Sequence, residues 1–343
     1  MRKLIVALFL CNMAFISQSF AAGRDTAFLT KRFPVSSVTK IDVATAGGRI
    51  EVNGSATQEA IVELFIQPNN ASKWTDEKIQ SVLDEHYELD IKTENGVLTA
   101  HAHRKKGFKW SSNTGLSISF RITTPRTVDG EIKTSGGSIE LRNVSGTLDF
   151  HTSGGSIRID KATGHLTGKT SGGSVQISDS KDYIDIATSG GSIKAEDCSG
   201  TITLQTSGGS INLNDLSGNI TAKTSGGSVR AEDITGTLHA STSGGNMILE
   251  DIAGNLEAST SGGRMKVDMR SVAEYVRLHN SGRIDLAVPS GGYTLDLKSR
   301  EVNTPELNAF SGSLKPNDIT GTQYGGGPEL TVKSSHRVSL SFK

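Results

Sequence analysis

The stretch TSGGSIRIDKATGHLTGK occupies residues 152–169, and residue 170 starts the same phrase again. A step of 18 residues that never changes indicates a repeat protein, in which each copy is one structural unit stacked on the next. The tetrapeptide TSGG begins at Thr134, Thr152, Thr170, Thr188, Thr206, Thr224, Thr242 and Thr260.

Each copy holds two short runs in which aliphatic and polar residues alternate, such as Ile157-Arg158-Ile159, and each run follows a glycine. Alternation with period two predicts a strand with one buried face, and the glycines predict turns with positive φ. One inserted residue would turn every later side chain of a strand to the wrong face, which explains the constant step. We therefore expect an all-β, single-domain β-solenoid, of the β-helix or β-roll kind, with 18-residue rungs of two short strands.

The glycine of the second turn recurs at the same place in the repeat, and Asp182 is the exception. Aspartate is one of the few residues besides glycine that tolerates the left-handed conformation, so this rung is expected to persist. The threonine of TSGG is expected to form hydrogen bonds between stacked turns. The recurring glycines are Gly146, Gly164, Gly200, Gly218, Gly236 and Gly254.

Weaker copies of the repeat flank the regular array, at residues 46–52 before it and at residues 281–286, 298–302 and 333–338 after it. A helical insertion is predicted near residues 72–87, with Trp74, Ile79, Val82 and Leu83 at helical spacing. We expect the helix to cover the flank or end of the solenoid. The predicted organisation is a signal peptide (1–22), an N-terminal cap with degenerate rungs (23–133), the regular array (134–277), and degenerate C-terminal rungs with a cap (278–343).

The first residues, MRKLIVALFLCNMAFISQSFAAGR, have the basic start, apolar run and small-residue cleavage site of a signal peptide. We expect cleavage after Ala21 or Ala22 and a periplasmic or extracellular, surface-located protein without a transmembrane segment. Lipidation at Cys11 is the alternative, but the bulky Leu10 before it is unfavourable. After cleavage only Cys198 remains, so no intrachain disulfide can form, and a small buried thiol is expected there rather than a reactive one.

The formal charge is zero, with 36 basic and 36 acidic residues, which argues against nucleic-acid binding. Residues 18 apart form columns on a solenoid, and two outward columns are candidate sites. An acidic column could be capped by turn N–H groups, which would lower its pKa values, or could bind divalent cations weakly. Its members are Asp179, Asp197, Asp215, Asp233 and Asp251, after Asn143 and Lys161.

The second column is mildly basic and could be solvated sheet surface or a face that binds anionic polysaccharide. It contains Glu140, Arg158, Gln176, Lys194, Asn212, Arg230, Ile248 and Lys266, with Arg158, Lys194, Arg230 and Lys266 as the candidate binding face. His101 and His103 share a strand face and could bind a metal, although the sequence shows no third ligand.

Tandem TSGGSI rungs, a preceding strand that ends at Pro125, and the closing stretch YGGGPELTVK at residues 324–333 resemble a bacterial adhesin-like family of unknown function. That family is related to autotransporter-adhesin head domains. The resemblance implies the solenoid architecture and brings no catalytic residues.

We therefore expect a non-catalytic, exported, adhesin-like module that presents a rigid face to the cell envelope or to a surface. Its partners would be anionic envelope or extracellular polysaccharide, or surface proteins, and no cofactor is expected. The alternatives are a structural envelope spacer and a glycan-active β-helix enzyme. The latter class interrupts its repeat with long loops around a cleft of acids, and this array contains no such loop.

Overall fold

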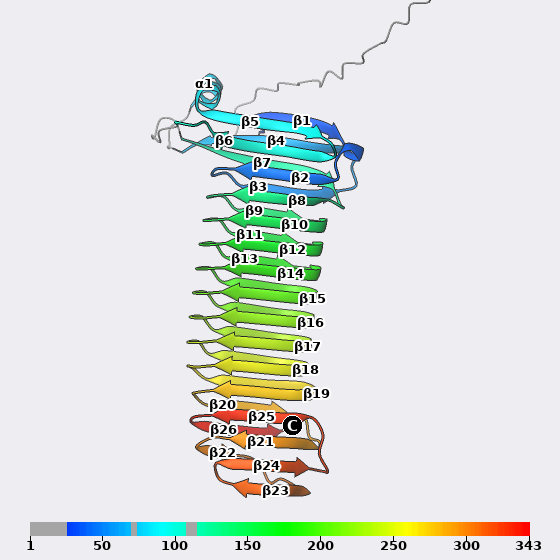
Figure 1. The fold of residues 1–343 in the computed structure, drawn as a ribbon, viewed down its shortest axis with the longest axis vertical. Helices are drawn as coiled ribbons and strands as arrows, with labels where there is room; N and C mark the ends of the chain where they lie inside the picture. The colour runs from blue at the N-terminus through cyan, green and yellow to red at the C-terminus, as the bar shows by residue number, and fades with distance from the viewer. Residues whose placement is uncertain (1–25, 70–73, 108–114) are drawn as a thin grey trace, which may run out of the picture.

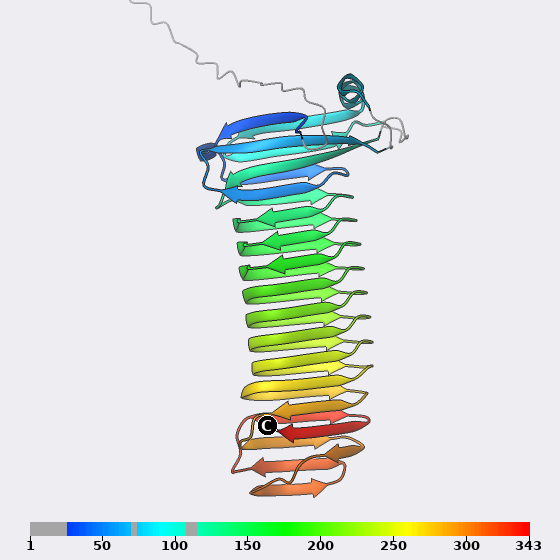
Figure 2. The same ribbon diagram turned by 180° about the vertical axis from the view of Figure 1, so that it is seen from behind.

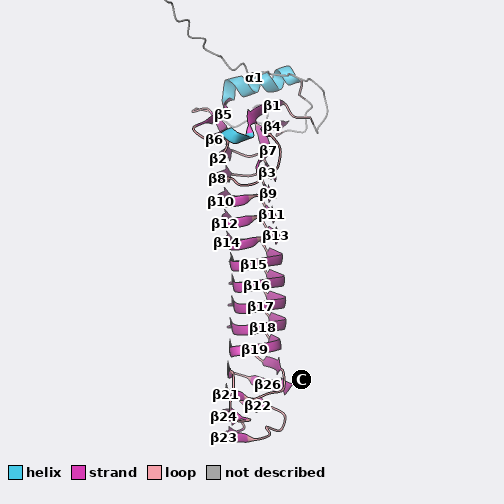
Figure 3. Cartoon of the chain, turned by 90° about the vertical axis from the view of Figure 1, so that its right-hand side faces the viewer, coloured by secondary structure: helices cyan, strands magenta, loops and turns pink. Residues whose placement is uncertain are grey.

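The computed structural model describes residues 26–69, 74–107 and 115–343. The predicted signal peptide and Cys11 lie outside the described residues. The described chain forms a tall, flattened stack of rungs along one axis, and both broad views show the stack without interruption (Figures 1 and 2). Viewed from the edge, the stack is narrow and has two layers of strands (Figure 3).

Each rung of the regular array adds one longer strand to one layer, here the wide stack, and one four-residue strand to the other, the narrow stack. Strands pair in parallel with the strand 18 residues later, so that Leu148 is opposite Leu166 and Ile157 is opposite Val175. This register confirms the predicted β-solenoid. The wide stack contains β8 (Asp129–Thr134), β10 (Ser145–Thr152), β12 (Thr163–Thr170) and β14 (Lys181–Thr188), and the narrow stack contains β9 (Ile139–Arg142), β11 (Ile157–Asp160) and β13 (Val175–Ser178).

Further along the array, one long strand per rung passes from the narrow stack around a corner into the wide stack. The corner is made by a left-handed residue and a positive-φ glycine, such as Asp197 (φ 53°) and Gly200 (φ 118°). Asp182 takes the glycine's place at φ 80°, as predicted. These strands are β15 (Ile193–Thr206), β16 (Ile211–Thr224), β17 (Val229–Thr242), β18 (Met247–Thr260) and β19 (Met265–Asn280).

The core is a thin layer of aliphatic side chains between the two stacks. Ile157 and Ile159 from the narrow stack and Leu166 from the wide stack are at most 1% exposed, whereas Arg158 between them is exposed. The period-two alternation therefore places the apolar residues inside, as expected. Thr170, at the end of the same rung, is also buried.

The N-terminal end is closed by strands that depart from the repeat and by a helix. The weak copy at residues 46–52 contains the turn between β2 (Lys40–Thr45) and β3 (Ile50–Ser55) and the first residues of β3, and these two strands lie between the regular array and this cap. Antiparallel strands cover the end of both stacks. The elements are β1 (Leu29–Pro34), the 3-10 turn η1 (Val35–Ser37), β2, β3, β4 (Glu59–Pro68), α1 (Asp76–His86), β5 (Tyr87–Glu94), β6 (Val97–Arg104) and β7 (Leu116–Pro125).

The predicted helix is confirmed as α1, which packs against β5 at this end of the solenoid. The Thr75 hydroxyl caps it by accepting a hydrogen bond from the Lys78 N–H at 3.3 Å. Ile79, Val82 and Leu83 form its buried face. Among the residues that the structure describes, no helix has the length and apolar character needed to cross a membrane.

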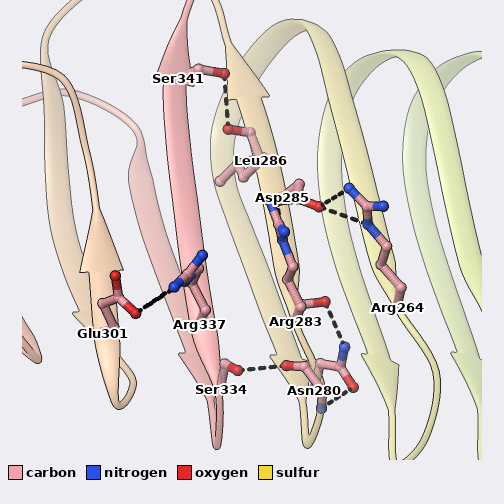
Figure 4. A network of polar contacts seen from close by, with 10 residues as sticks. Arg264, Asn280, Arg283, Asp285, Leu286, Glu301, Ser334, Arg337 and Ser341 are labelled. Atoms are coloured by element: carbon pink, nitrogen blue, oxygen red, sulfur yellow. Dashed lines mark hydrogen bonds and ion pairs between the residues drawn. The ribbon is translucent and has the colours of Figure 1, made fainter.

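At the C-terminal end, the last rung in sequence is not the last rung in space. β25 lies between β19 and β21, and β26 lies between β20 and β22. Ion pairs support this end, with Arg264 and Arg283 both bound to Asp285, and Arg337 bound to Glu301 at 2.8 Å (Figure 4). The strands are β20 (Ile284–Val288), β21 (Tyr293–Lys298), β22 (Glu301–Asn303), β23 (Phe310–Lys315), β24 (Asp318–Gln323), β25 (Glu329–Ser334) and β26 (Arg337–Phe342).

Candidate functional site

The TSGG turns bring successive rungs into close contact along one edge of the narrow stack. A Cβ on Gly173 would lie 2.0 Å from the carbonyl oxygen of Gly155, which is the equivalent glycine one rung earlier. Neither glycine has a left-handed φ. The prediction of positive φ is therefore wrong for Gly155 and Gly173, although it is confirmed for the second-turn glycines such as Gly200 and for Gly263 (φ 70°) in the last TSGG turn. Gly173 is glycine because a side chain would collide with the neighbouring backbone.

A shallow groove of about 280 Å³ lies on the outer face of the narrow stack beside these turns. It crosses four rungs, which are about 4.8 Å apart, and therefore runs along the solenoid axis for roughly 14 Å. One wall is a column of turn serines, and the other is the central part of the predicted basic column. The lining residues are Ser156, Ile157, Arg158, Ser174, Val175, Gln176, Ser192, Ile193, Lys194 and Asn212.

The charges in this groove are all positive, because none of its ten lining residues is acidic. Lys194 pairs with Glu196 at 2.6 Å, on the side away from the serine wall. Arg158 is exposed and has no ion-pair partner among the described residues. The groove thus offers one uncompensated guanidinium group together with hydroxyl and amide groups, a combination that can bind a carboxylate or sulfate and its neighbouring hydroxyls.

Only two of the four residues of the predicted binding face line the groove. Arg158 and Lys194 line the groove, whereas Arg230 and Lys266 lie outside it and share Glu250, at 3.2 and 2.7 Å. At the N-terminal end of the column, the buried carboxylate of Glu140 pairs with arginines on both sides. The charge of the column is therefore concentrated at Arg158.

Sequence reasoning missed the serine wall. Serine follows TSGG in most copies of the repeat, and this regularity was the available signal. From Ser192, the last serine of the groove wall, the same column stabilises stacking, since the Ser192 hydroxyl accepts a hydrogen bond from the Ser210 N–H at 3.2 Å. Ser156 and Ser174 have no such side-chain bond in the described part of the chain, and their hydroxyls are exposed.

The backbone conformation explains why aspartate recurs in the acidic column. Asp179, Asp197, Asp215, Asp233 and Asp251 all have φ between 49° and 58°, and the left-handed region favours aspartate and asparagine among residues with a side chain. Within the described part of the chain none of these five carboxylates accepts a hydrogen bond from a backbone N–H, and the predicted lowering of the pKa is wrong at Asp197. Loss of hydration, with the carboxylates of Asp215 and Asp179, raises the pKa of Asp197.

Neither candidate metal site gains support from the geometry. The described residues contain no group of three or more His, Cys, Asp or Glu side chains arranged to hold a metal ion. Asp233 and Asp251 instead contact Arg270, at 2.8 and 3.4 Å. His101 lies 2.9 Å from Asp42 and makes an edge contact with the ring of His103.

Together these features define the described chain as a β-solenoid repeat protein with a polar, positively charged groove on one face. Residues 178–336 match the family described as Toastrack DUF4097. The match confirms the resemblance to a family of unknown function that the TSGGS rungs indicated. A search of curated proteins finds no match.

Two solved structures are similar to the chain at low scores. A candidate cell adhesion protein from Clostridium sporogenes is 9% identical, with a TM-score of 0.25, over 92% of this chain and 98% of its own. A candidate adhesin from Bacteroides fragilis is 14% identical, with a TM-score of 0.24, over 92% of this chain and 96% of its own. At this level of similarity the two structures give no information about the groove.

Proposed function

We propose that the protein is an exported, non-catalytic, adhesin-like module that binds anionic polysaccharide of the cell envelope or of an extracellular surface along its groove. The observation that carries the proposal is the groove itself, which has Arg158 and Lys194 among its lining and no acidic residue. A linear polymer suits it, because the groove is open and follows the axis of a rigid stack.

The chemistry of the lining agrees with a sugar acid as the ligand. Arginine binds carboxylate and sulfate groups through two parallel hydrogen bonds. Gln176 and Asn212 offer both donors and acceptors, and the hydroxyls of Ser156 and Ser174 do the same, so ring hydroxyls can be bound between the charges. Sheet strands beneath these residues hold them at fixed spacing, which lowers the entropic cost of binding.

A structural spacer within the envelope is the second candidate. The ion pairs that neutralise Lys194, Arg230 and Lys266 favour it, because they give most of this face a balanced charge. A glycan-active enzyme is the weaker alternative, since a glycosidase needs a pair of carboxyl groups at its site and this groove has none in its lining.

The experiment is binding of residues 23–343 to immobilised uronate-containing, sulfated and neutral polysaccharides, with and without calcium. We expect binding to the acidic polymers, weakening as salt is raised. Arg158→Glu should abolish it. Arg230→Glu is the matched control, because Arg230 belongs to the same column but lies outside the groove, and it should leave binding within about twofold of the parent.

Equal loss in both variants would show that the whole face acts through its summed charge rather than through the groove. Absence of binding to every acidic polymer would overturn the proposal and leave the spacer. Binding that requires calcium would assign the interaction to carboxylates, and the acidic column would then replace the groove as the site.

A further inference from the structure

The two stacks do not end together at the C-terminal end of the solenoid. Beyond β19 the wide stack continues through β25, β21, β24 and β23, whereas the narrow stack continues only through β20, β26 and β22. In Figure 1, β23 is the last strand at this end. The inner face of β23 therefore lies beyond the last strand of the opposite stack.

Leu314 of β23 belongs to the core face but is exposed. It is opposite Ile319 in the β23–β24 pair, and residues opposite each other in an antiparallel pair lie on the same face. Ile319 is 4% exposed and part of the core, whereas Leu314 is 59% exposed. The segment between β22 and β23 brings Leu307 against the core but leaves Leu314 uncovered.

β23 is also a free edge. Among the described strands it pairs with β24 alone, so half of its backbone N–H and C=O groups face away from the sheet. Such an edge is a template for another strand unless charge, proline or a covering element blocks it. Five of its six residues are exposed, and the only charge within it is Lys315, at its end.

The sequence of this edge is nearly palindromic: Phe310-Ser311-Gly312-Ser313-Leu314. If two copies pair antiparallel about Gly312, Phe310 of each chain is opposite Leu314 of the other, and Ser311 is opposite Ser313. Both apolar pairs then lie on the core face, and a residue without a side chain lies on the two-fold axis. We propose that a second copy of this chain docks on β23 in this register, joining two solenoids end to end.

Two charges of opposite sign lie close to this edge in the sequence. Lys315 follows the palindrome and Glu306 precedes it by four residues, and neither forms an ion pair with any residue that the structure describes. Antiparallel pairing about Gly312 brings Lys315 of each copy opposite Ala309 of the other, three residues after Glu306 in the sequence, twice by symmetry. An isologous contact of this kind is complete in a dimer. The opposite end of the solenoid is covered by α1 and antiparallel strands, so a closed pair is expected and not a fibre.

Sedimentation of residues 23–343 over a concentration series tests the proposal. We expect a concentration-dependent dimer with the elongated shape of two solenoids in line. Leu314→Lys should weaken the dimer at least tenfold, whereas Tyr324→Lys, which changes another exposed apolar residue near this end, should not. A parent chain that stays monomeric throughout, or a dimer insensitive to Leu314→Lys, would overturn the proposal.

A cross-linking experiment tests the register and stays informative if Leu314→Lys fails to fold. Ser311→Cys and Ser313→Cys chains are prepared separately and then mixed under oxidising conditions. The proposed register predicts a disulfide-linked dimer in the mixture and little with either variant alone, because only Ser311 and Ser313 are opposite each other. Cys198 is 2% exposed and should not interfere. Equal cross-linking in all three samples, or none in any, would contradict the register.

Discussion

The hydroxyl of Thr170 donates a hydrogen bond to the carbonyl oxygen of Gly155, one rung earlier, at 2.8 Å. The same hydroxyl accepts a hydrogen bond from the N–H of Gly173 in its own turn at 3.3 Å. Equivalent pairs recur through the regular array, as at Thr188 and Gly173. One buried hydroxyl thus satisfies two backbone groups and links neighbouring turns, as expected from the sequence.

Replacing Thr170 by valine should destabilise the solenoid, because the shape is kept while both hydrogen bonds are lost. Two buried backbone groups would be left without partners, at a cost of about 1–3 kcal/mol in the free energy of unfolding. Urea denaturation measures it. Thr167→Val is the control: Thr167 lies on the outer face of the same strand without a side-chain hydrogen bond to the described residues, and its effect should stay within about 0.5 kcal/mol. Equal losses would contradict the role assigned to Thr170.

The two glycines of one TSGG turn should respond differently to the same substitution. In Gly173→Ala the new Cβ would lie 2.0 Å from the Gly155 oxygen, whereas in Gly172→Ala its nearest neighbour would be 3.6 Å away. We expect Gly173→Ala to lower the free energy of unfolding by about 3 kcal/mol or more, because neighbouring backbones must separate. Gly172→Ala should be nearly neutral. Thermal unfolding of both variants tests this, and similar melting temperatures would show that close approach is not what requires glycine.

The fold was predictable because its register depends on local pattern. Alternation such as Ile157-Arg158-Ile159 defines the buried face, and the constant step leaves one way of stacking the rungs. The prediction was mistaken about why TSGG contains glycine. The reason is a contact between turns of successive rungs, which the sequence of one turn does not reveal. The acidic column was explained by hydrogen bonding, although its cause is the left-handed corner at residues such as Asp197.

The order of the terminal rungs and the groove could not be predicted. Nothing in the sequence near β25 indicates that it is inserted between β19 and β21. Its partners are distant in sequence, and the pairing depends on how all the strands at this end pack together. The groove arises where Arg158, Gln176 and Lys194 follow one another beside Ser156 and Ser174, whose hydroxyls form no hydrogen bond with the described residues. Columns of serine and of charge are visible in the sequence, but the space between them depends on how each side chain is paired.

Asp197→Asn should stabilise the protein at neutral pH. Loss of hydration and the neighbouring carboxylates of Asp215 and Asp179 raise the pKa of Asp197 above its usual value of 3.8. The folded state therefore favours the protonated form, and its contribution to stability is full below pH 3.8 and is lost as the pH rises through the folded pKa. Asparagine removes the charge and tolerates the left-handed backbone, as Asn143 does at φ 54° in the same column.

The measurement is the melting temperature of Asp197→Asn and of the parent at pH 7 and pH 3. The variant should melt higher at pH 7, and the difference should disappear near pH 3. Asp185→Asn is the control, because Asp185 is opposite Thr167 and Thr203 in the wide stack and has no carboxylate beside it in the ladder. A gain of the same size at both pH values would mean that repulsion is not its source.

Cys198 should be unreactive in the folded protein. Burial raises the pKa of the Cys198 thiol to about 11, although backbone hydrogen bonds at Ser180 and Glu196 oppose this shift. The thiol also donates a hydrogen bond to the carbonyl oxygen of Glu196 at 3.0 Å, and this bond favours the protonated form. At pH 8 the thiolate is then about 0.1% of the total, and the thiolate is the nucleophile. Alkylation by iodoacetamide, followed by mass spectrometry, should be at least about 100-fold slower than in urea-unfolded chain. A Thr201→Cys variant places a thiol on the exposed outer face and should react rapidly without unfolding. If Cys198 reacted as fast as that thiol, the corner of its rung would have to open in the native state, and the reactive alternative would replace the buried one.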